Sequence, residues 1–587
     1  MLLLLQSAAM AAEQTEEKHE NSALNTLLFC FLMALCVFVG YMLKKYKFYY
    51  LPESAAVMAL GCIAGGIVKA VNPSAEELSF LTFKPEVFFF ILLPPIIFEA
   101  GYTLNKKGFF SNFTTIMMFA VVGTLISTFI IALLMWGLAA AKAIPLEDHT
   151  PLEALLFGAL ISAVDPVATL AIMGAKEINC DPLLYSLVFG ESVLNDAVAI
   201  VLFRTIKGFL PPPGGEVKEF TFMTVLSVLG RFLYISFGSI LIGVLIGLLC
   251  SFIFKNTLIK KYPKYEITTL ILTAFGSYAL SEAISMSGIM ALFFTGITLS
   301  HYNFYNLSES SQISSTYVFE AVASFSETIV FAYLGTTIFS DVHQWSISMI
   351  FFAIVICAIA RAANTFPLSA FVNIKRKVKI SKNMQVVIWF AGLRGAVAFA
   401  LALTLSTANA QYIITTTLCI VLFTTFICGG LTEPMLGKFG MKQGPGTVRR
   451  ASSGDLGAHS LLDDDSDGAD QNDRNNVGGI VIPSSRSGSR GGFHGWFSKF
   501  DKRTMKPVFG GAKPSKFRGA QEMGLDLSGD NLFDSMDSPG KGNKKQLGNN
   551  KNPKRKSSET RGPPYSPPQS PQNGKGGKFE NFSDSAI

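Results

Sequence analysis

Long runs of apolar residues, separated by short polar stretches, fill the chain from about residue 25 to about residue 440. A run of ~20 apolar residues is the length that an α-helix needs to cross a bilayer. The pattern therefore predicts an all-α polytopic membrane protein with about thirteen transmembrane helices. The predicted spans are 25–43, 53–71, 85–101, 113–139, 153–174, 183–204, 222–254, 266–284, 287–300, 315–339, 345–372, 384–406 and 412–436.

Composition agrees with this class. Hydrophobic residues make up 50% of the 587 residues and charged residues only 16%, whereas soluble domains carry about 25% charged residues. A soluble enzyme, a disulfide scaffold and a fully disordered chain are excluded. The formal net charge of +7 comes mostly from the region after Gln443. A basic tail next to a membrane favours anionic lipid headgroups as partners over nucleic acid.

Three regions follow from the pattern. Residues 1–24 form an N-terminus placed in the lumen or outside the cell, and residues 1–12 fit either a short signal peptide or a plain apolar start. Residues 25–440 form the membrane domain. Residues 441–587, rich in Gly, Ser, Pro, Asn and Lys, are predicted to be a disordered cytosolic tail. This orientation places most loop Lys and Arg residues inside, as the positive-inside rule requires.

Polar residues interrupt the fifth and sixth spans. Asp165-Pro166 lies in the middle of the fifth span, and Pro disfavours helix at the residue before it. The sixth span contains Glu191, Asn195 and Asp196. Ionisable residues at membrane depth are costly and indicate function. Carboxylate and amide oxygens suit Na⁺, K⁺ or H⁺, so one carboxylate that binds either a proton or a cation would make an antiporter.

Two arginines lie in later spans. Arg361 of the eleventh span stays charged and needs a buried anion; Glu191 is the favoured partner and Glu327 of the tenth span the second candidate. Arg394 of the twelfth span lies between Gly392 and Gly395, which favour unwinding. Arg394 and Glu327 are the candidates for compensating half-helix charge. Breaks in the fifth and twelfth spans predict two inverted repeats whose broken helices cross at a midplane site.

Several segments resemble the eukaryotic sodium/proton exchangers, members of the monovalent cation:proton antiporter family. They are FFFILLPPIIFEAGYTL, LISAVDPVATLAI, VFGESVLNDAVAIVLF, ISMSGIMALFFTGITLSHY, FSETIVFAYLG and GLRGAVAFAL. The resemblance runs from about Leu51 to Leu436, and LPESAAVMALG is most similar to the Golgi and endosomal branch, which includes the eighth animal isoform. It implies a homodimer whose protomers exchange H⁺ for Na⁺ or K⁺ by an elevator movement.

The resemblance also implies residue roles. The family's Asn-Asp ion site falls on Asn195 and Asp196, its fifth-span Asp on Asp165, and its structural Glu-Arg pair on Glu191 and Arg361. The family's inhibitor-sensitive stretch falls on Phe89, Leu93, Pro94, Pro95 and Phe98. Plasma-membrane relatives bind a calcineurin-like calcium-binding subunit on a helix after the last span; GKFGMKQGPGTVRRASSGD offers no such helix, which puts that subunit in doubt.

The sequence thus predicts an electroneutral secondary antiporter, not an enzyme, with no cofactor and no metal beyond the transported cation. Its location would be the Golgi or endosomal membrane, or the plasma membrane, where it would regulate pH and cation balance. The alternative is a transport-inactive scaffold or ion sensor of the same fold. Tail regulation through phosphorylation is a further hypothesis, with sites at Ser452, Ser538, Ser557, Ser566 and Ser570.

Overall fold

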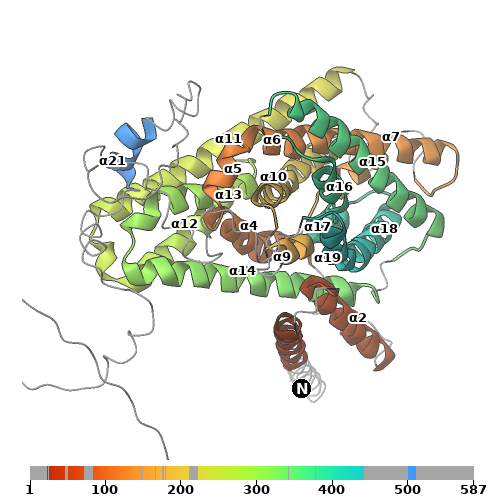
Figure 1. Ribbon diagram of the computed structural model, residues 1–587. Helices are drawn as coiled ribbons and strands as arrows, with labels where there is room; N and C mark the ends of the chain where they lie inside the picture. Colours follow the sequence, from red (N-terminus) through yellow and green to blue (C-terminus); the bar gives the residue numbers. More distant parts are fainter. Residues whose placement is uncertain are drawn as a thin grey trace, which may run out of the picture. The chain divides into compact units, whose positions relative to one another are not determined.

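The computed structural model describes residues 23, 26–46, 50–71, 84–146, 150–165, 167–174, 178, 180–210, 222–340, 343–376, 378–441 and 500–510. Within these residues the chain is helical and contains no β-strand (Figure 1). The proposed signal peptide at residues 1–12 lies outside the described residues. So do the tail serines Ser452, Ser538, Ser557, Ser566 and Ser570.

Nine helices within the described residues are long and apolar enough to cross a membrane. They are Thr26–Tyr46, α2 (Glu53–Val71), α3 with η2 and α4 (Pro85–Tyr102), α6 with η3 and α7 (Phe113–Ala140), α10 (Pro182–Lys207), α11 (Phe222–Asn256), α14 (Glu309–Thr337), α15 (Ile347–Asn373) and α18 with η7 and α19 (Ala410–Lys438). Each coincides with a span expected from the sequence, so the prediction of an all-α polytopic membrane protein is confirmed.

The remaining expected spans are less apolar, shorter or interrupted helices. They are α12 (Pro263–Ala283), α13 (Gly288–Thr298) continued by η5 (Leu299–Asn303), α8 (Leu152–Ile161) followed by α9 (Val167–Met173), and α16 (Lys382–Phe390) followed by α17 (Ala396–Leu403). The two helix breaks fall at the fifth and twelfth spans, where the sequence predicts them. Pro166 itself lies outside the described residues, while Gly392 and Gly395 lie within the second break.

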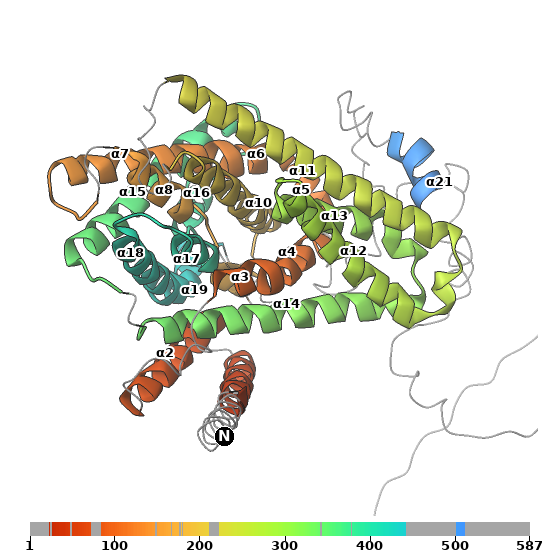
Figure 2. The ribbon, with the colours of Figure 1, turned by 180° about the vertical axis from the view of Figure 1, so that it is seen from behind.

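The helices pack in two groups. In the first, here called the scaffold group, α14 packs along α2 and α4, and α13 packs against α4, α11 and α12 (Figures 1 and 2). In the second, the site group, α7 packs against α8 and α15, α10 packs against α8, and α17 packs against α18. The site group contains both broken helices, and it carries Asp165, Glu191, Asn195, Asp196, Arg361 and Arg394.

Glycines let α2 and α14 approach closely. A Cβ atom added at Gly61 would lie 2.3 Å from the carbonyl oxygen of Ala332, and one added at Gly335 would lie 2.2 Å from the carbonyl oxygen of Met58. Such backbone contact through small residues is the usual means of helix association in membranes, where helices gain little from apolar burial against each other. It fixes α14 onto α2 in the scaffold group.

One segment of the tail is helical. The sequence predicts no regular structure in residues 441–587, yet η8 (Asp501–Met505) and α21 (Lys506–Phe509) form helical turns on the membrane domain. The Tyr302 hydroxyl donates to Asp501 Oδ1 at 2.6 Å, and His301 Nε2 lies 3.2 Å from Asp501 Oδ2. The segment has no apolar periodicity of its own, so these tertiary contacts stabilise its helical turns.

The end of this segment is held by close packing. Asn306 Nδ2 donates to the Phe509 carbonyl oxygen at 2.9 Å, and the Phe509 ring packs against the rings of Phe252 and Tyr302. Gly510 has φ +103°, and a Cβ atom added there would lie 2.3 Å from Asn306 Oδ1. Only glycine therefore fits at this position without displacing Asn306.

The charge of Asp501 is also favoured where it is docked. Burial would raise the pKa of Asp501, but the hydrogen bonds from His301 and Tyr302 outweigh burial and lower it. A lowered pKa means that the carboxylate stabilises docking above its ordinary pKa of about 3.9, and that this stabilisation is lost as the pH falls through the lowered value. At neutral pH the contribution is therefore complete.

We predict that Gly510→Ala releases residues 500–510 from the membrane domain. The backbone conformation of Gly510, with φ +103° and ψ −170°, costs a non-glycine residue about 1–3 kcal/mol, and the contact with Asn306 adds to it. Amide hydrogen exchange of the segment in the full chain should accelerate roughly tenfold or more. Gly440→Ala is the matched control, because Gly440 also has a positive φ of +66° but no atom lies within 4 Å of the added Cβ. Unchanged exchange in Gly510→Ala would contradict the docking.

Candidate functional site

Helix α10 carries three buried polar side chains in its middle. Glu191, Asn195 and Asp196 are 3%, 1% and 7% exposed. The helix begins at a Pro in its first turn after Asp181, whose side chain accepts a hydrogen bond from the Leu183 amide at 2.8 Å. This N-cap starts a helix of 26 residues, long enough to cross the bilayer and to hold the three side chains near its centre.

Asn195 connects α10 to the break between α8 and α9. Its Oδ1 accepts a hydrogen bond from the Val164 amide at 3.1 Å, and its Nδ2 donates to Thr124 Oγ1 at 2.8 Å. Ser192 Oγ donates to the Val164 carbonyl oxygen at 3.2 Å. Both backbone groups of Val164, which the helix break leaves without helical partners, are therefore bonded to side chains of α10.

Asp165 lies where the two broken helices cross. Its amide donates to the Leu393 carbonyl oxygen at 3.0 Å, which joins the two unwound stretches directly. Its Oδ1 accepts a hydrogen bond from the Val167 amide at 3.3 Å, at the start of α9. A Cβ atom added at Gly395 would lie 2.0 Å from Asp165 Oδ2, so glycine at this position makes room for the carboxylate.

Arg394 binds the C-terminal end of α8. Its Nη1 donates to the carbonyl oxygens of Ser162 at 3.0 Å and Ala163 at 3.1 Å, and its amide donates to Thr424 Oγ1 at 3.1 Å. The C-terminal end of a helix carries partial negative charge, which is costly in an apolar environment and is stabilised by a cation. Arg394 is only 2% exposed, so it supplies that cation inside the protein.

Arg361 makes the corresponding contact at the C-terminal end of α16. Its Nη2 donates to the Ile388 carbonyl oxygen at 3.0 Å, in the last turn of α16. The same guanidinium forms a buried ion pair with Glu191, with Nη1 donating to Oε1 and Nη2 donating to Oε2 at 3.1 Å. A Cβ atom added at Gly392 would lie 2.8 Å from Arg361 Nε, so glycine here leaves space for the guanidinium.

Asp196 differs from Glu191 and Asn195 because one of its carboxylate oxygens has no hydrogen-bond donor among the described residues. Its Oδ1 is buried and accepts no hydrogen bond from the residues that the structure describes. The charges of Asp165 and Arg394 lie near enough to act on it. Buried polar atoms are almost always bonded, so a carboxylate oxygen without a partner beside a second carboxylate is suited to hold a proton or a cation.

Other residues singled out by the sequence lie elsewhere. Glu327 lies half-buried on α14, and the hydrogen bonds of Arg361 go to Glu191 and Ile388 instead. Phe89 lies in the π-helical turn η2 (Phe88–Leu92), and Leu93, Pro94, Pro95 and Phe98 lie in α4. Phe98 packs on Tyr102 and Phe319 in the scaffold group.

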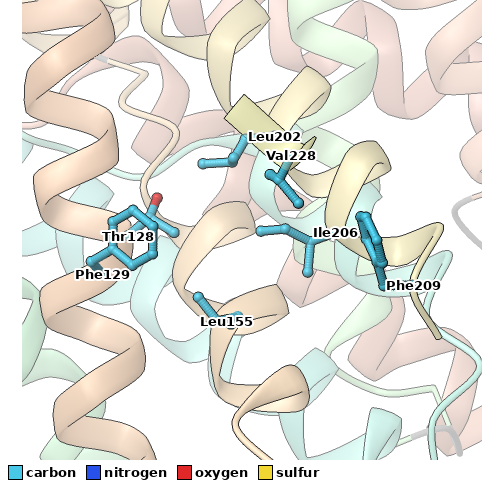
Figure 3. A pocket seen from close by; sticks show the side chains of 7 residues that line it. All are labelled: Thr128, Phe129, Leu155, Leu202, Ile206, Phe209 and Val228. Atoms are coloured by element: carbon cyan, nitrogen blue, oxygen red, sulfur yellow. The ribbon is translucent and has the colours of Figure 1, made fainter. Parts of the chain in front are cut away.

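The described residues hold no group placed as a resident metal centre, and neither of two pockets found among them is lined by Asp165, Asn195 or Asp196. No group of three or more His, Cys, Asp and Glu side chains there is placed to hold a metal ion. A small pocket between α7, α8, α10 and the start of α11 has an almost wholly apolar lining (Figure 3). It is lined by Thr128, Phe129, Leu155, Leu202, Ile206, Phe209 and Val228. The chemistry therefore rests on the crossing of the broken helices.

Comparison with known proteins places this arrangement in a family. The family described as "Sodium/hydrogen exchanger, transmembrane" matches residues 31–438. The chain belongs to the sodium/hydrogen exchanger family. It is 42% identical over 433 residues to Sodium/hydrogen exchanger 8 of Rattus norvegicus, covering 72% of this chain and 74% of the relative. It is 37% identical to Sodium/hydrogen exchanger 5 of Arabidopsis thaliana, covering 72% and 81%.

The fold of this exchanger is shared with an archaeal antiporter. The structure of the sodium proton antiporter MjNhaP1 from Methanocaldococcus jannaschii matches with a TM-score of 0.51 and 19% identity, covering 69% of this chain and 95% of the other. Members of the family are secondary transporters that couple sodium and proton movement. The family resemblance expected from the sequence motifs is therefore confirmed.

Three hydroxyl residues at the site are not among those that the sequence motifs single out. Thr124 of α7, Ser192 of α10 and Thr424 of η7 (Thr424–Cys428) each bond to a residue of the crossing or of α10. Thr124 belongs to a row of hydroxyls that continues at Ser127 and Thr128, at helical spacing on an otherwise apolar helix. That row indicates a polar face at membrane depth, so the sequence itself marks Thr124 as a candidate. Thr424 lies in a TTF sequence that has no such pattern.

We predict that Arg361 and Glu191 of this exchanger are coupled in stability. Removing one partner of a buried ion pair typically costs about 3–5 kcal/mol, because the other charge is left unpaired. Arg361→Ala should therefore lower the thermal unfolding temperature strongly, and adding Glu191→Ala should partly restore it. Arg376→Ala is the control, since Arg376 bonds only to neutral groups, Thr115, Asn112 and Val378, in the described contacts. Additive losses in the double variant would argue against coupling.

Proposed function

We propose that this protein exchanges H⁺ for Na⁺ or K⁺ with Asp196 as the carboxylate that binds either ion. The observation that carries the proposal is the buried Asp196 oxygen without a hydrogen-bond partner, next to Asp165 and the crossing of two broken helices. A cation entering the site takes oxygen ligands from Asp196 and Asp165, with the Asn195 side chain holding the unwound backbone beside them. Since protonation removes the charge that attracts the cation, the two ligands compete for one group.

The fixed charges set the stoichiometry. Arg361 cannot release a proton at any working pH, and Glu191 is bonded to it through both carboxylate oxygens. Arg394 is bonded to the end of α8 and is likewise permanently charged. None of these groups delivers a proton during the cycle. Asp165 accepts a hydrogen bond from the Val167 amide, which leaves Asp196 as the main group that alternates between proton and cation. One H⁺ would then exchange for one Na⁺ or K⁺, and turnover would move no net charge.

Access to the site would alternate by an elevator movement. The broken helices, α10 and α7 pack together in the site group, while α2, α4 and α11–α14 form the scaffold group, which α10 meets along α11 through apolar packing of Val198 and Val201 on Phe232. The unwound stretches are cross-linked to one another and to α10 by hydrogen bonds. The site group is thus suited to move as one body along the scaffold group, carrying Asp196 from one side of the membrane to the other.

The cellular setting completes the proposal. The resemblance of the sequence motifs to the Golgi and endosomal branch is the basis for proposing a Golgi or endosomal membrane, with the plasma membrane as the other location, and a homodimer in a lipid bilayer. The N-terminus would face the lumen or the outside, and residues 441–587 would form a regulatory cytosolic tail. In an acidic organelle the exchanger would release luminal protons for cytosolic cations and raise luminal pH. A transport-inactive scaffold or sensor is the alternative, which the preserved Asp196 disfavours.

We predict that Asp196→Asn abolishes exchange while the protein still folds. An amide cannot take up and release a proton at neutral pH, so cation-driven proton flux in proteoliposomes should fall to the level of empty vesicles. Asp181→Asn is the matched control, because it makes the same change on the same helix at a position where Asn also serves as an N-cap. A folded Asp196→Asn protein with normal flux would remove Asp196 from the mechanism; a wild type with no flux for either Na⁺ or K⁺ would favour the scaffold alternative.

We also predict that exchange does not respond to membrane voltage. Proteoliposomes with a K⁺ gradient and valinomycin impose a potential, and Na⁺ present equally on both sides serves as the test cation. An electroneutral exchanger gains nothing from the potential, which is worth about 2.3 kcal/mol per charge per 100 mV for a net-charge carrier. The pH change driven by the K⁺ gradient itself is measured without valinomycin, and no further pH change is expected when valinomycin is added, beyond that of vesicles with Asp196→Asn. A pH change driven by the potential alone would show a stoichiometry other than one to one.

A further inference from the structure

An ion pair joins the C-terminal ends of α10 and α12. Arg204 Nη1 lies 2.9 Å from Glu282 Oε1 and 2.7 Å from Glu282 Oε2, so one nitrogen donates to both carboxylate oxygens. Arg204 is on the helix that carries Asp196, eight residues further along, or about 12 Å at the rise of an α-helix. Neither residue belongs to the ion site, yet Arg204 moves with the site if α10 moves.

Glu282 is held in place on the scaffold side. The Gly288 amide at the start of α13 donates to Glu282 Oε1 at 3.0 Å. The turn between α12 and α13 is closed by Met286 N donating to the Ser281 carbonyl oxygen at 2.8 Å, with Ser285 in the left-handed region at φ +60°, as at many helix ends. This turn fixes the carboxylate that receives Arg204.

The tight fit of Gly288 adds to this support. A Cβ atom added at Gly288 would lie 2.7 Å from the Tyr278 ring and 2.9 Å from Glu282 Cγ. Glycine thus allows α13 to begin close beside the Glu282 side chain. The acceptor for Arg204 is therefore a preformed position on α12 and α13 and not a freely moving surface carboxylate.

The pair crosses the boundary between the two helix groups. Arg204 lies on α10, which packs against α8 in the site group, and Glu282 lies on α12, which packs against α13 in the scaffold group. Lys207, one turn beyond Arg204, shows the contrast: its Nζ donates to the Thr404 carbonyl oxygen at the end of α17, within the site group. Only the first of these two contacts would have to break if the groups slide past each other.

We propose that Arg204 and Glu282 form a latch that favours the conformation in which their face of the membrane is closed. This inference rests on the proposed function, because it requires α10 to move during exchange. The orientation assigned above places the latch on the luminal or extracellular face. The two residues are positioning residues, since neither contacts the transported ion. Opening that face separates α10 from α12 and breaks the pair, so the latch biases the protein toward the state open to the cytosol.

The size of this bias follows from exposure. The Arg204 side chain is 41% exposed and that of Glu282 18%, and partly exposed ion pairs are weakened by water and salt. Loss of such a pair changes an equilibrium by roughly two- to fivefold. The latch is therefore expected to shift the balance between the two states, which appears as a change in apparent affinity on each face, without locking the transporter.

The test uses the full-length protein in vesicles of one orientation, with the apparent KM for Na⁺ measured from each face. Arg204→Gln should lower the KM at the outer face and raise it at the cytosolic face, each roughly two- to fivefold. Glu282→Gln, which keeps an acceptor for the Gly288 amide, should do the same. The double variant should add nothing further, and Arg204→Lys should restore values near wild type. Arg231→Gln, which removes an exposed arginine from α11, is the control for charge.

The outcomes separate the latch from the proposed function. Equal KM values for wild type and Arg204→Gln at both faces would overturn the latch, and so would equal changes at both faces or additive effects in the double variant. Failure of the proposed function appears instead as absent flux in the wild type. Hydrogen exchange at residues 284–290 gives a readout that needs no transport: it should rise in Arg204→Gln and stay at the wild-type level in Arg231→Gln. No rise would count against the latch.

Discussion

Two broken helices inside a membrane domain create a problem of charge, and the arrangement of the site follows from its solution. A broken helix leaves carbonyl groups without partners and a partial negative charge at the C-terminal end of each first half. Arg394 covers the end of α8 and Arg361 covers the end of α16. Each half-helix end is thus matched by one permanent cation, and the carbonyl groups gain the donors that lipid does not offer.

These cations in turn decide what the carboxylates do. Arg361 requires an anion at fixed distance, and Glu191 supplies it through two hydrogen bonds. That carboxylate is therefore committed to structure. Asp196, one residue past Asn195 on the same helix, points to a place where one oxygen meets no donor in the described part of the protein. The division between a structural carboxylate and one open to ligands comes from geometry, because both are acidic residues at similar depth on α10.

The same division extends to the helix groups. Hydrogen bonds between backbone and side chains tie the broken helices, α10 and α7 into one body, while glycine contacts tie α2 to α14. Across the boundary α10 packs on α11, where Val198 and Val201 are buried against Phe232, and the Arg204–Glu282 pair at the end of α10 is partly open to water. Apolar packing is not directional and the ion pair is partly exposed, so these contacts suit a transporter whose parts must move past each other many times.

The sequence determined that this is a polytopic membrane protein, where its spans lie and which of its residues carry the chemistry. The tertiary structure decided which of those residues pair with one another. Apolar length identified the helices, because a bilayer demands about 20 apolar residues for each, and Pro and Gly placed both breaks. Buried charges could be recognised one by one, since each is costly in lipid. Three contacts join residues over 150 positions apart in the sequence. They are the pairing of Arg361 with Glu191, the binding of Arg394 to Ser162 and Ala163, and the docking of Asp501 on His301 and Tyr302. No local pattern encodes such contacts, because they arise only when separate helices pack.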